Sequence, residues 1–216
     1  MNGRTPLHQS QVILICLLSV ITTPVAASVS DICVRAAQAA AHAHNVPAEV
    51  LIAIAQTETG RNSGGDVEPW PWTLNVEGQG YWLATRAQTL AQAQLAIADG
   101  KNSFDLGCFQ LNYRWHGQHF ASLDQMLDPR AGADYAAKFL AGLYAETGDW
   151  SAAAGAYHSR TAVHAARYRR QFDPLYAAAL QNSETDFRAN TFPLLQQGGA
   201  VKSLGSLVPV SARVTE

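Results

Sequence analysis

One glutamate near the end of an apolar segment is the first candidate for chemistry. The segment AIAQTETG (53–60) places Glu58 two residues before a glycine. On a helix, Leu51, Ile54 and Glu58 share one face, so this carboxyl continues an apolar stripe. Burial and the negative end of a helix both disfavour a carboxylate, which predicts an acid protonated near neutral pH. Such an acid can donate a proton to a leaving oxygen. The spacing is equally compatible with a frayed last turn that leaves Glu58 in water.

Other catalytic chemistries lack their motifs in this sequence. The histidines form no HExxH pattern, the cysteines have no zinc spacing, and there is neither a GxSxG elbow nor a phosphate loop. His116 and His119 are close along the chain, but two histidines alone are weak evidence for a metal site. We therefore expect no metal and no cofactor.

The N-terminal residues 1–27 have the form of a secretory signal. Arg4 precedes the apolar run VILICLLSVI (12–21), and small residues precede Ser28. We expect cleavage after Ala27 and a periplasmic protein; the alternative is an uncleaved membrane anchor. Cleavage removes Arg4 and leaves 14 of the 15 basic residues against 17 acidic ones, a net charge of −3. This balance argues against nucleic acid as a partner.

Export also bears on the cysteines. Cys16 lies in the predicted signal segment, so the mature chain keeps Cys33 and Cys108. An even number of cysteines in an exported chain favours one disulfide over two buried thiols. A single bridge cannot replace a hydrophobic core, so we expect an ordinary globular domain.

The elements that must position Glu58 are mostly helical. Apolar residues at helical spacing, with glycine, proline and asparagine at the ends, predict helices over 31–45, 46–60, 83–100, 128–148, 149–159 and 162–181. Residues 61–82 hold most of the tryptophans and predict a loop with a short hairpin, and residues 101–117 predict a loop or a short strand. Gly60 is expected in the left-handed conformation that ends a helix. We predict a mainly α domain over 28–181, with a small irregular or β insert lining a cleft, and a flexible tail over 182–216.

Three sequence blocks, taken in order, resemble those of the SLT-type lytic transglycosylases, which share the lysozyme fold. AIAQTETG matches a helix that ends in Glu followed by Ser or Thr, and FDLGCFQLN (104–112) matches a strand with the pattern Gly-apolar-apolar-Gln. AAGAYHS (153–159) matches Ala-Tyr-Asn, except that His158 replaces the Asn. The resemblance covers residues 31–178, and the Trp-rich insert and Cys108 depart from it.

The resemblance implies cleavage of the β-1,4 bond between N-acetylmuramic acid and N-acetylglucosamine in peptidoglycan. Glu58 would be the single essential acid, and the muramyl 6-hydroxyl would attack to give a 1,6-anhydro sugar. Hydrolysing glycosidases usually need two carboxylates. Asp105 is therefore decisive: facing the cleft it permits hydrolysis by a muramidase on the same fold, whereas in a turn it is structural. We favour the turn. A non-catalytic wall-binding module is a third reading.

Other polar and aromatic side chains also have candidate roles, and the resemblance implies that of Tyr157. Gln110 is expected to bind a sugar, or else to contact a sheet edge, and Tyr157 to orient Glu58, or else to lie in the core. Four aromatic residues of the insert are expected to stack on sugars, although some must pack inward: Trp70, Trp72, Tyr81 and Trp82. Trp115 and Trp150 are expected in the core.

In the lysozyme fold the first helix packs behind the cleft strand. The resemblance therefore implies a Cys33–Cys108 bridge that holds Gln110 opposite Glu58. Small exported members of this family accompany secretion systems, pili or flagella. We accordingly expect a monomer that acts on glycan strands, with such an assembly as a candidate partner.

Overall fold

The computed structural model describes residues 28–189, and for residues 184–189 only the backbone. The predicted signal segment 1–27 and the stretch 190–216 of the predicted tail lie outside the described residues. Within residues 28–189 the chain is mainly helical with a small antiparallel sheet, as predicted. The helices are α1 Asp31–His44, α2 Ala48–Thr59, α3 Arg86–Ala98, α4 Tyr113–His116, α5 Leu123–Leu127, α6 Pro129–Thr147, α7 Trp150–His158 and α8 Ala162–Ala189, with a 3₁₀ turn at Gly117–His119.

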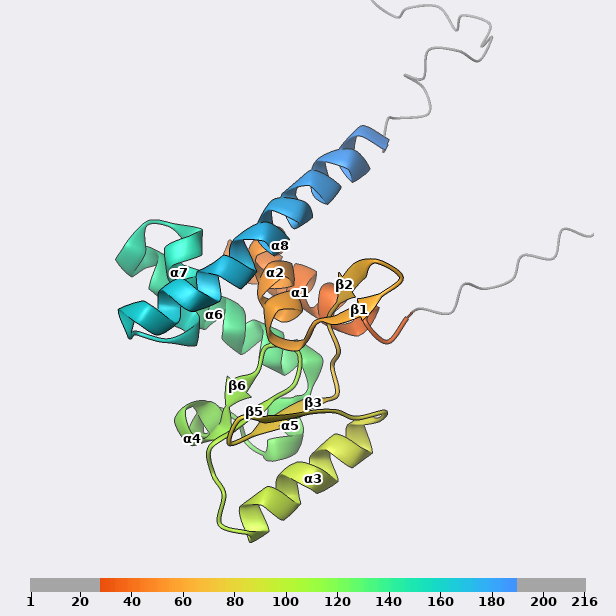
Figure 1. Ribbon diagram of the computed structural model, residues 1–216, viewed down its shortest axis with the longest axis vertical. Helices are drawn as coiled ribbons and strands as arrows, with labels where there is room; N and C mark the ends of the chain where they lie inside the picture. Colours follow the sequence, from red (N-terminus) through yellow and green to blue (C-terminus); the bar gives the residue numbers. More distant parts are fainter. Residues whose placement is uncertain (1–27, 190–216) are drawn as a thin grey trace, which may run out of the picture.

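The main body consists of α1, α2, α6, α7 and α8, and α2 contacts each of the other four (Figure 1). Helix α2 packs against α1 and α8, while α6 packs against α1 and α7. Alanines dominate the buried face of α1, and their small side chains let neighbouring helices approach closely. Helix α2 buries apolar residues around most of its circumference: Val50, Leu51, Ala53, Ile54 and Ala55. A carboxyl on this helix therefore starts from an apolar environment.

The strands form two small antiparallel sheets. Strands β1 (Arg61–Ser63) and β2 (Asp66–Glu68) pair as a hairpin directly after α2. Strands β3 (Thr73–Val76), β4 (Gln79–Trp82), β5 (Phe104–Leu106) and β6 (Leu111–Asn112) form a second sheet in the order β4-β3-β5-β6. Helix α3 packs on β3 and α5, at the end of the molecule opposite α8 (Figure 1).

Several local predictions differ from the structure. Gly60 has φ −60° and ψ 136°, so it is extended rather than left-handed. Glycine is required there because a Cβ would lie 2.2 Å from the Gln56 carbonyl oxygen and 2.4 Å from Val67 Cγ1. Helix α8 continues to Ala189, beyond the predicted end at 181, and residues 117–127, for the most part unassigned from sequence, contain the 3₁₀ turn and α5.

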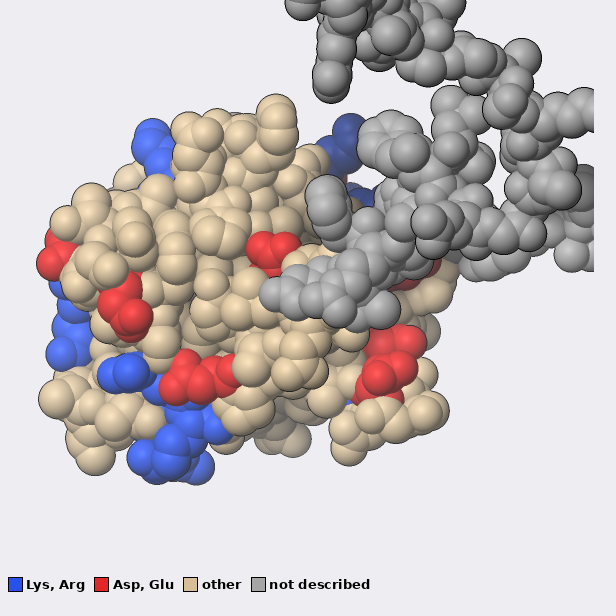
Figure 2. Space-filling model, turned by 90° about the horizontal axis from the view of Figure 1, so that it is seen from above, with Lys and Arg blue, Asp and Glu red and all other residues tan. Residues whose placement is uncertain are grey.

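Two properties of the molecule bear on possible partners: the distribution of charge on its surface, and the length and apolar character of its helices. On the face shown in Figure 2, basic and acidic side chains are interspersed and most of the surface is uncharged. Within the part of the chain that the structure describes, no helix combines the length and apolar character needed to cross a membrane.

Candidate active site

A pocket of about 320 Å³ lies where the end of α2 meets the larger sheet, α4, α6 and α7. It contains the Glu58 side chain, and residues from all three sequence blocks line it. The lining residues are Glu58, Asn75, Asp105, Gln110, Leu111, Asn112, Trp115, His116, Phe139, Tyr157 and His158.

One face of the sheet supplies a row of polar groups to this pocket. Asn75 on β3 pairs in register with Asp105 on β5, which pairs with Asn112 on β6. Because side chains alternate between the two faces of a strand, the neighbouring residues Leu74 and Leu106 turn the other way and are buried in the core. The strand alternation therefore places amide and carboxyl groups toward Glu58.

Glu58 lies in the last turn of α2, which is intact to Thr59. The residue is half-buried, but protein surrounds its carboxyl, and burial raises the pKa of Glu58 from 4.5 to about 8. The nearby charge of Asp105 raises this pKa as well, whereas the Tyr168 hydroxyl lowers it. The direction of this pKa shift agrees with the expectation from the sequence, and the last turn of α2 is intact rather than frayed.

Tyr168 is a neighbour of Glu58 that the sequence did not indicate. Its side chain comes from α8 and is 5% exposed, and its hydroxyl lies close to the carboxyl of Glu58. In this conformation the hydroxyl completes no hydrogen bond with any residue that the structure describes. Burial raises the pKa of Tyr168 well above 10, so the phenol stays a proton donor. The only hint in the sequence is the spacing of Tyr168, Phe172 and Tyr176, which places three aromatic rings on one face of α8.

Gln110 lies in a tight turn at the pocket wall. The turn begins at Gly107, whose φ of 75° favours glycine, and Gln110 itself has a positive φ of 42°. The side-chain nitrogen of Gln110 donates to the carbonyl oxygens of Gly107 (3.0 Å) and Thr73 (3.3 Å). These bonds fix the amide, so its oxygen is available to a ligand N–H or O–H. A positive φ at a residue other than glycine is uncommon and is often associated with function.

Tyr157 lines the pocket but does not hold Glu58 in the predicted way. Its hydroxyl donates to the carbonyl oxygen of Phe109 at 2.8 Å, so its proton is not directed at the carboxyl. Burial raises the pKa of Tyr157 well above 10, with a contribution from the negative charge of Glu58. Tyr157 therefore anchors the backbone next to Gln110, and the hydroxyl that lowers the pKa of Glu58 is that of Tyr168.

Asp105 also differs from the prediction. It lies in strand β5 rather than in a turn, and it faces the same pocket as Glu58. Asn112 Nδ2 donates to its Oδ1 at 2.8 Å. Burial raises the pKa of Asp105, while the hydrogen bond from Asn112 lowers it. Two carboxyl groups therefore share one pocket.

The aromatic residues of the insert are not where the sequence placed them. Trp70, Trp72, Tyr81 and Trp82 are all absent from the pocket lining. Trp70 donates its indole N–H to the Leu83 carbonyl (2.7 Å), and Trp82 donates to the Thr59 carbonyl (3.1 Å). Trp72 packs against the hydrophobic core. The insert therefore braces the end of α2 beside Glu58.

Two histidines complete the rim. The ring of His158 stacks on Tyr168 with centroids 4.7 Å apart, and burial lowers its pKa. His116 Nδ1 lies 2.8 Å from the Tyr135 hydroxyl oxygen, and burial lowers its pKa too. Among the residues that the structure describes, no group of three or more His, Cys, Asp or Glu could hold a metal ion.

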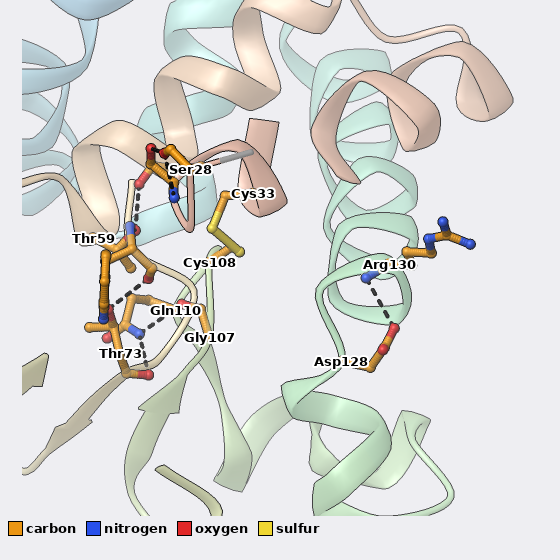
Figure 3. The surroundings of a disulfide bond; sticks show 12 residues. Ser28, Cys33, Thr59, Thr73, Gly107, Cys108, Gln110, Asp128 and Arg130 are labelled. Carbon is orange, nitrogen blue, oxygen red and sulfur yellow. Dashed lines mark hydrogen bonds between the residues drawn. A yellow bond between two sulfur atoms is a disulfide. The ribbon is translucent and has the colours of Figure 1, made fainter. Parts of the chain in front are cut away.

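The predicted disulfide is present behind the pocket. Cys33 on α1 and Cys108 are joined, with Cα atoms 5.6 Å apart, and both residues are buried. In Figure 3 the bridge lies beside the turn that carries Gly107 and Gln110. It ties α1 to the residue two positions before Gln110, on the side away from the pocket.

No family model matches this chain, and neither a curated protein nor a solved structure is similar enough to it to count as a match.

Proposed function

We propose that this chain is an exported lytic transglycosylase with a lysozyme-like fold that cleaves glycan strands of peptidoglycan. The observation that carries this proposal is Glu58, an enclosed carboxyl with a pKa of about 8 that faces a polar pocket. A second support is that the three sequence blocks, far apart in the chain, converge there through Glu58, Gln110 and Tyr157.

The first step is proton donation. At pH 7 an acid with a pKa of about 8 is roughly nine-tenths protonated, whereas an ordinary glutamate is almost fully ionised. Protonated Glu58 donates to the glycosidic oxygen as the bond from that oxygen to the muramyl anomeric carbon breaks. N-acetylglucosamine leaves with the proton, and Glu58 becomes a carboxylate.

In the second step Glu58 acts as a base, and the same buried environment favours this role. A carboxylate destabilised by burial and by Asp105 is a stronger base than an exposed one, so Glu58 readily takes the proton of the muramyl 6-hydroxyl. The 6-oxygen then bonds to the anomeric carbon and closes the 1,6-anhydro ring. Tyr168 lowers the pKa of Glu58 and so stabilises the carboxylate between the two steps.

Asp105 supports one alternative function, hydrolysis of the same bond by a muramidase. A muramidase that hydrolyses the bond needs a second carboxylate facing the first, and Asp105 lines the same pocket as Glu58. The hydrogen bond from Asn112 stabilises the ionised form of Asp105, as such a role requires. The two functions differ in whether water enters the product.

Glu58→Gln tests the acid directly. We expect a folded protein whose cleavage of purified sacculi falls by about a hundredfold or more, because the amide has no proton of useful acidity. Glu49→Gln is the matched control on the same helix, since Glu49 lines a different groove beside α8. Release of soluble muropeptides measures the rate, and circular dichroism checks the fold. Substantial activity in Glu58→Gln would refute the assignment.

A further inference from the structure

Basic side chains gather where the Glu58 pocket meets the start of α8. His158, at the end of α7, lines the pocket, and its ring stacks on Tyr168 with an angle of 12° between the ring planes. The first turns of α8 therefore lie directly beside this part of the lining. His164 and Arg167 belong to these turns and are exposed. Burial lowers the pKa of His158, and the nearby positive charges of His164 and Arg167 lower it further. We call these two residues the basic edge of the pocket.

Close packing of α7 against α8 fixes the position of the basic edge (Figure 1). Gly155 on α7 is buried, and a Cβ there would lie 3.0 Å from Arg169 Cδ and 3.3 Å from the Ala165 carbonyl oxygen. The glycine therefore lets the two helices approach closely. In the short link between them, the Thr161 backbone N–H donates to Ser159 Oγ at 3.1 Å. The basic edge thus stands on a packed helix rather than on a free loop.

Arg167 differs from neighbouring arginines in having no acceptor of its own. Arg160 donates to both carboxylate oxygens of Glu146, and Arg169 donates to the Ser151 hydroxyl. Arg167 has neither a hydrogen bond nor an ion pair with any residue whose side chain the structure describes. Its guanidinium is always charged and carries five N–H donors in a planar fork. Arg167 is therefore available to an anionic group of a ligand.

The interior of the pocket has the opposite charge. Glu58 and Asp105 both line it, and the hydrogen bond from Asn112 stabilises the ionised form of Asp105. A negative group on a ligand is therefore repelled by the interior and attracted by the basic edge. A ligand that carries a negative branch should bind with that branch directed toward the start of α8.

We propose that Arg167 binds a carboxylate of the peptide that branches from muramic acid, and so makes the pocket prefer glycan strands whose peptides carry free carboxylates. In peptidoglycan this peptide is joined to the muramyl ring, beside the bond cleaved in the proposed reaction. A guanidinium pairs with a carboxylate through two parallel N–H···O bonds, which gives the contact direction as well as energy. The inference rests on the proposed function, whose substrate carries such peptides, and it assigns Arg167 a role in specificity rather than in the chemical step.

The test compares two ligands that differ only in charge. They are a disaccharide tripeptide of peptidoglycan and the same compound with its carboxylates amidated, each titrated by calorimetry into the Glu58→Gln protein at low salt. The carboxylate ligand should bind this parent about threefold to fivefold more tightly than the amidated one. Adding Arg167→Gln should remove the preference without changing the affinity for the amidated ligand, and adding Arg167→Lys should retain part of it. Arg130→Gln is the matched control, because it removes the same charge at an exposed site in a different groove, between α1 and α6, and should leave the preference intact.

The outcomes separate this inference from the proposed function. A parent that binds both ligands equally, or neither, would overturn the role of Arg167, as would a preference that Arg167→Gln retains or Arg130→Gln loses. A glycerol phosphate polymer that binds through Arg167 as tightly as the tripeptide would assign the basic edge to wall phosphates and also overturn it. Cleavage of sacculi without the preference would leave the proposed function standing, whereas a preference that depends on Arg167, in a chain that does not cleave sacculi, would support this inference and refute the proposed catalysis. In an active chain, Arg167→Gln should raise KM for peptide-bearing strands about threefold to fivefold and leave kcat nearly unchanged.

Discussion

The environment of Glu58 favours its role as an acid but lowers the stability of the folded protein when Glu58 is ionised. Burial of its carboxyl disfavours the charged form, and Asp105 adds a second negative group nearby. The environment that keeps the acid protonated at neutral pH therefore destabilises the folded protein whenever Glu58 ionises. The same property that suits Glu58 to catalysis can be measured by unfolding.

The stability of the protein should depend on pH through this one residue. The folded-state pKa of about 8 exceeds the ordinary value of 4.5, so the contribution of Glu58 is fully present below pH 4.5 and is lost as pH rises toward 8. Glu58→Gln does not titrate. The free energy of unfolding of this variant, relative to wild type, should therefore rise with pH in this window by up to about 1.4 kcal/mol per unit. Urea unfolding of both proteins at several pH values measures it, and a difference independent of pH would contradict the raised pKa.

The role of a side chain could be predicted where it depends on the residue's own helix. It could not be predicted where it depends on strands or helices that are distant in the sequence. Glu58 was predicted because the stripe through Leu51 and Ile54 is local. Asp105 faces the pocket because β5 pairs with β3 and β6, and this register is not readable from one strand. Tyr168 reaches Glu58 from α8, a helix more than a hundred residues along the chain. Trp115, expected in the core, is 63% exposed, because its neighbours on α4, Tyr113 and His116, are the residues that pack inward.

At the scale of elements, most helices were predicted to within a few residues because their apolar period and end residues are local signals. Helix α3, for example, begins at the Thr85–Gln88 capping box and is followed by Gly100 with φ 76°. Helix α8 extends beyond the predicted end at 181 through the mostly polar stretch 182–189, in which no apolar period indicates a helix. Gly60 was assigned the wrong conformation, because its requirement comes from the approach of β2.

Gly60→Ala should destabilise the junction between α2 and β2. Its Cβ would overlap the Gln56 carbonyl oxygen and the Val67 side chain, and relieving an overlap with backbone typically costs about 1–3 kcal/mol. Gly142→Ala, in α6, is the control of opposite sign, since nothing lies within 4 Å of its Cβ and alanine favours helix by roughly 0.5–1 kcal/mol. Thermal unfolding compares the two, and equal effects would contradict the close approach.

The disulfide should contribute to both stability and alignment of the pocket. It joins α1 to the cleft turn across 75 residues of sequence, for which the chain-entropy model gives about 4 kcal/mol at most. Replacing Cys33 and Cys108 by alanine should lower Tm clearly and weaken sugar binding, because Gln110 is two residues from the bridge. Thiol titration of the unfolded, unreduced wild type should find no free thiol at these two positions, and two would refute the bridge.

At the scale of the molecule, the pocket exists only where the two parts of the domain meet. The helical body supplies the acid and Tyr168, the sheet supplies the amides and Asp105, and the bridge fastens α1 behind the turn. Of the insert, Asn75 lines the pocket, whereas Trp82 lies outside the lining and braces the end of α2. We propose that a monomer of this architecture opens glycan strands in the periplasm, in the service of a secretion, pilus or flagellar assembly.

Mass analysis of the soluble products released from purified sacculi, in water enriched in the heavy oxygen isotope, tests this account most directly. We predict 1,6-anhydro-muramyl ends, lighter than reducing ends by one water and free of the isotope. Asp105→Asn should lower the rate by only about threefold to tenfold, since it removes a charge that raises the pKa of Glu58, and should leave the ends unchanged. Labelled reducing muramic acid ends from the wild type, lost in Asp105→Asn, would instead make Asp105 a second catalytic carboxylate and the protein a hydrolase.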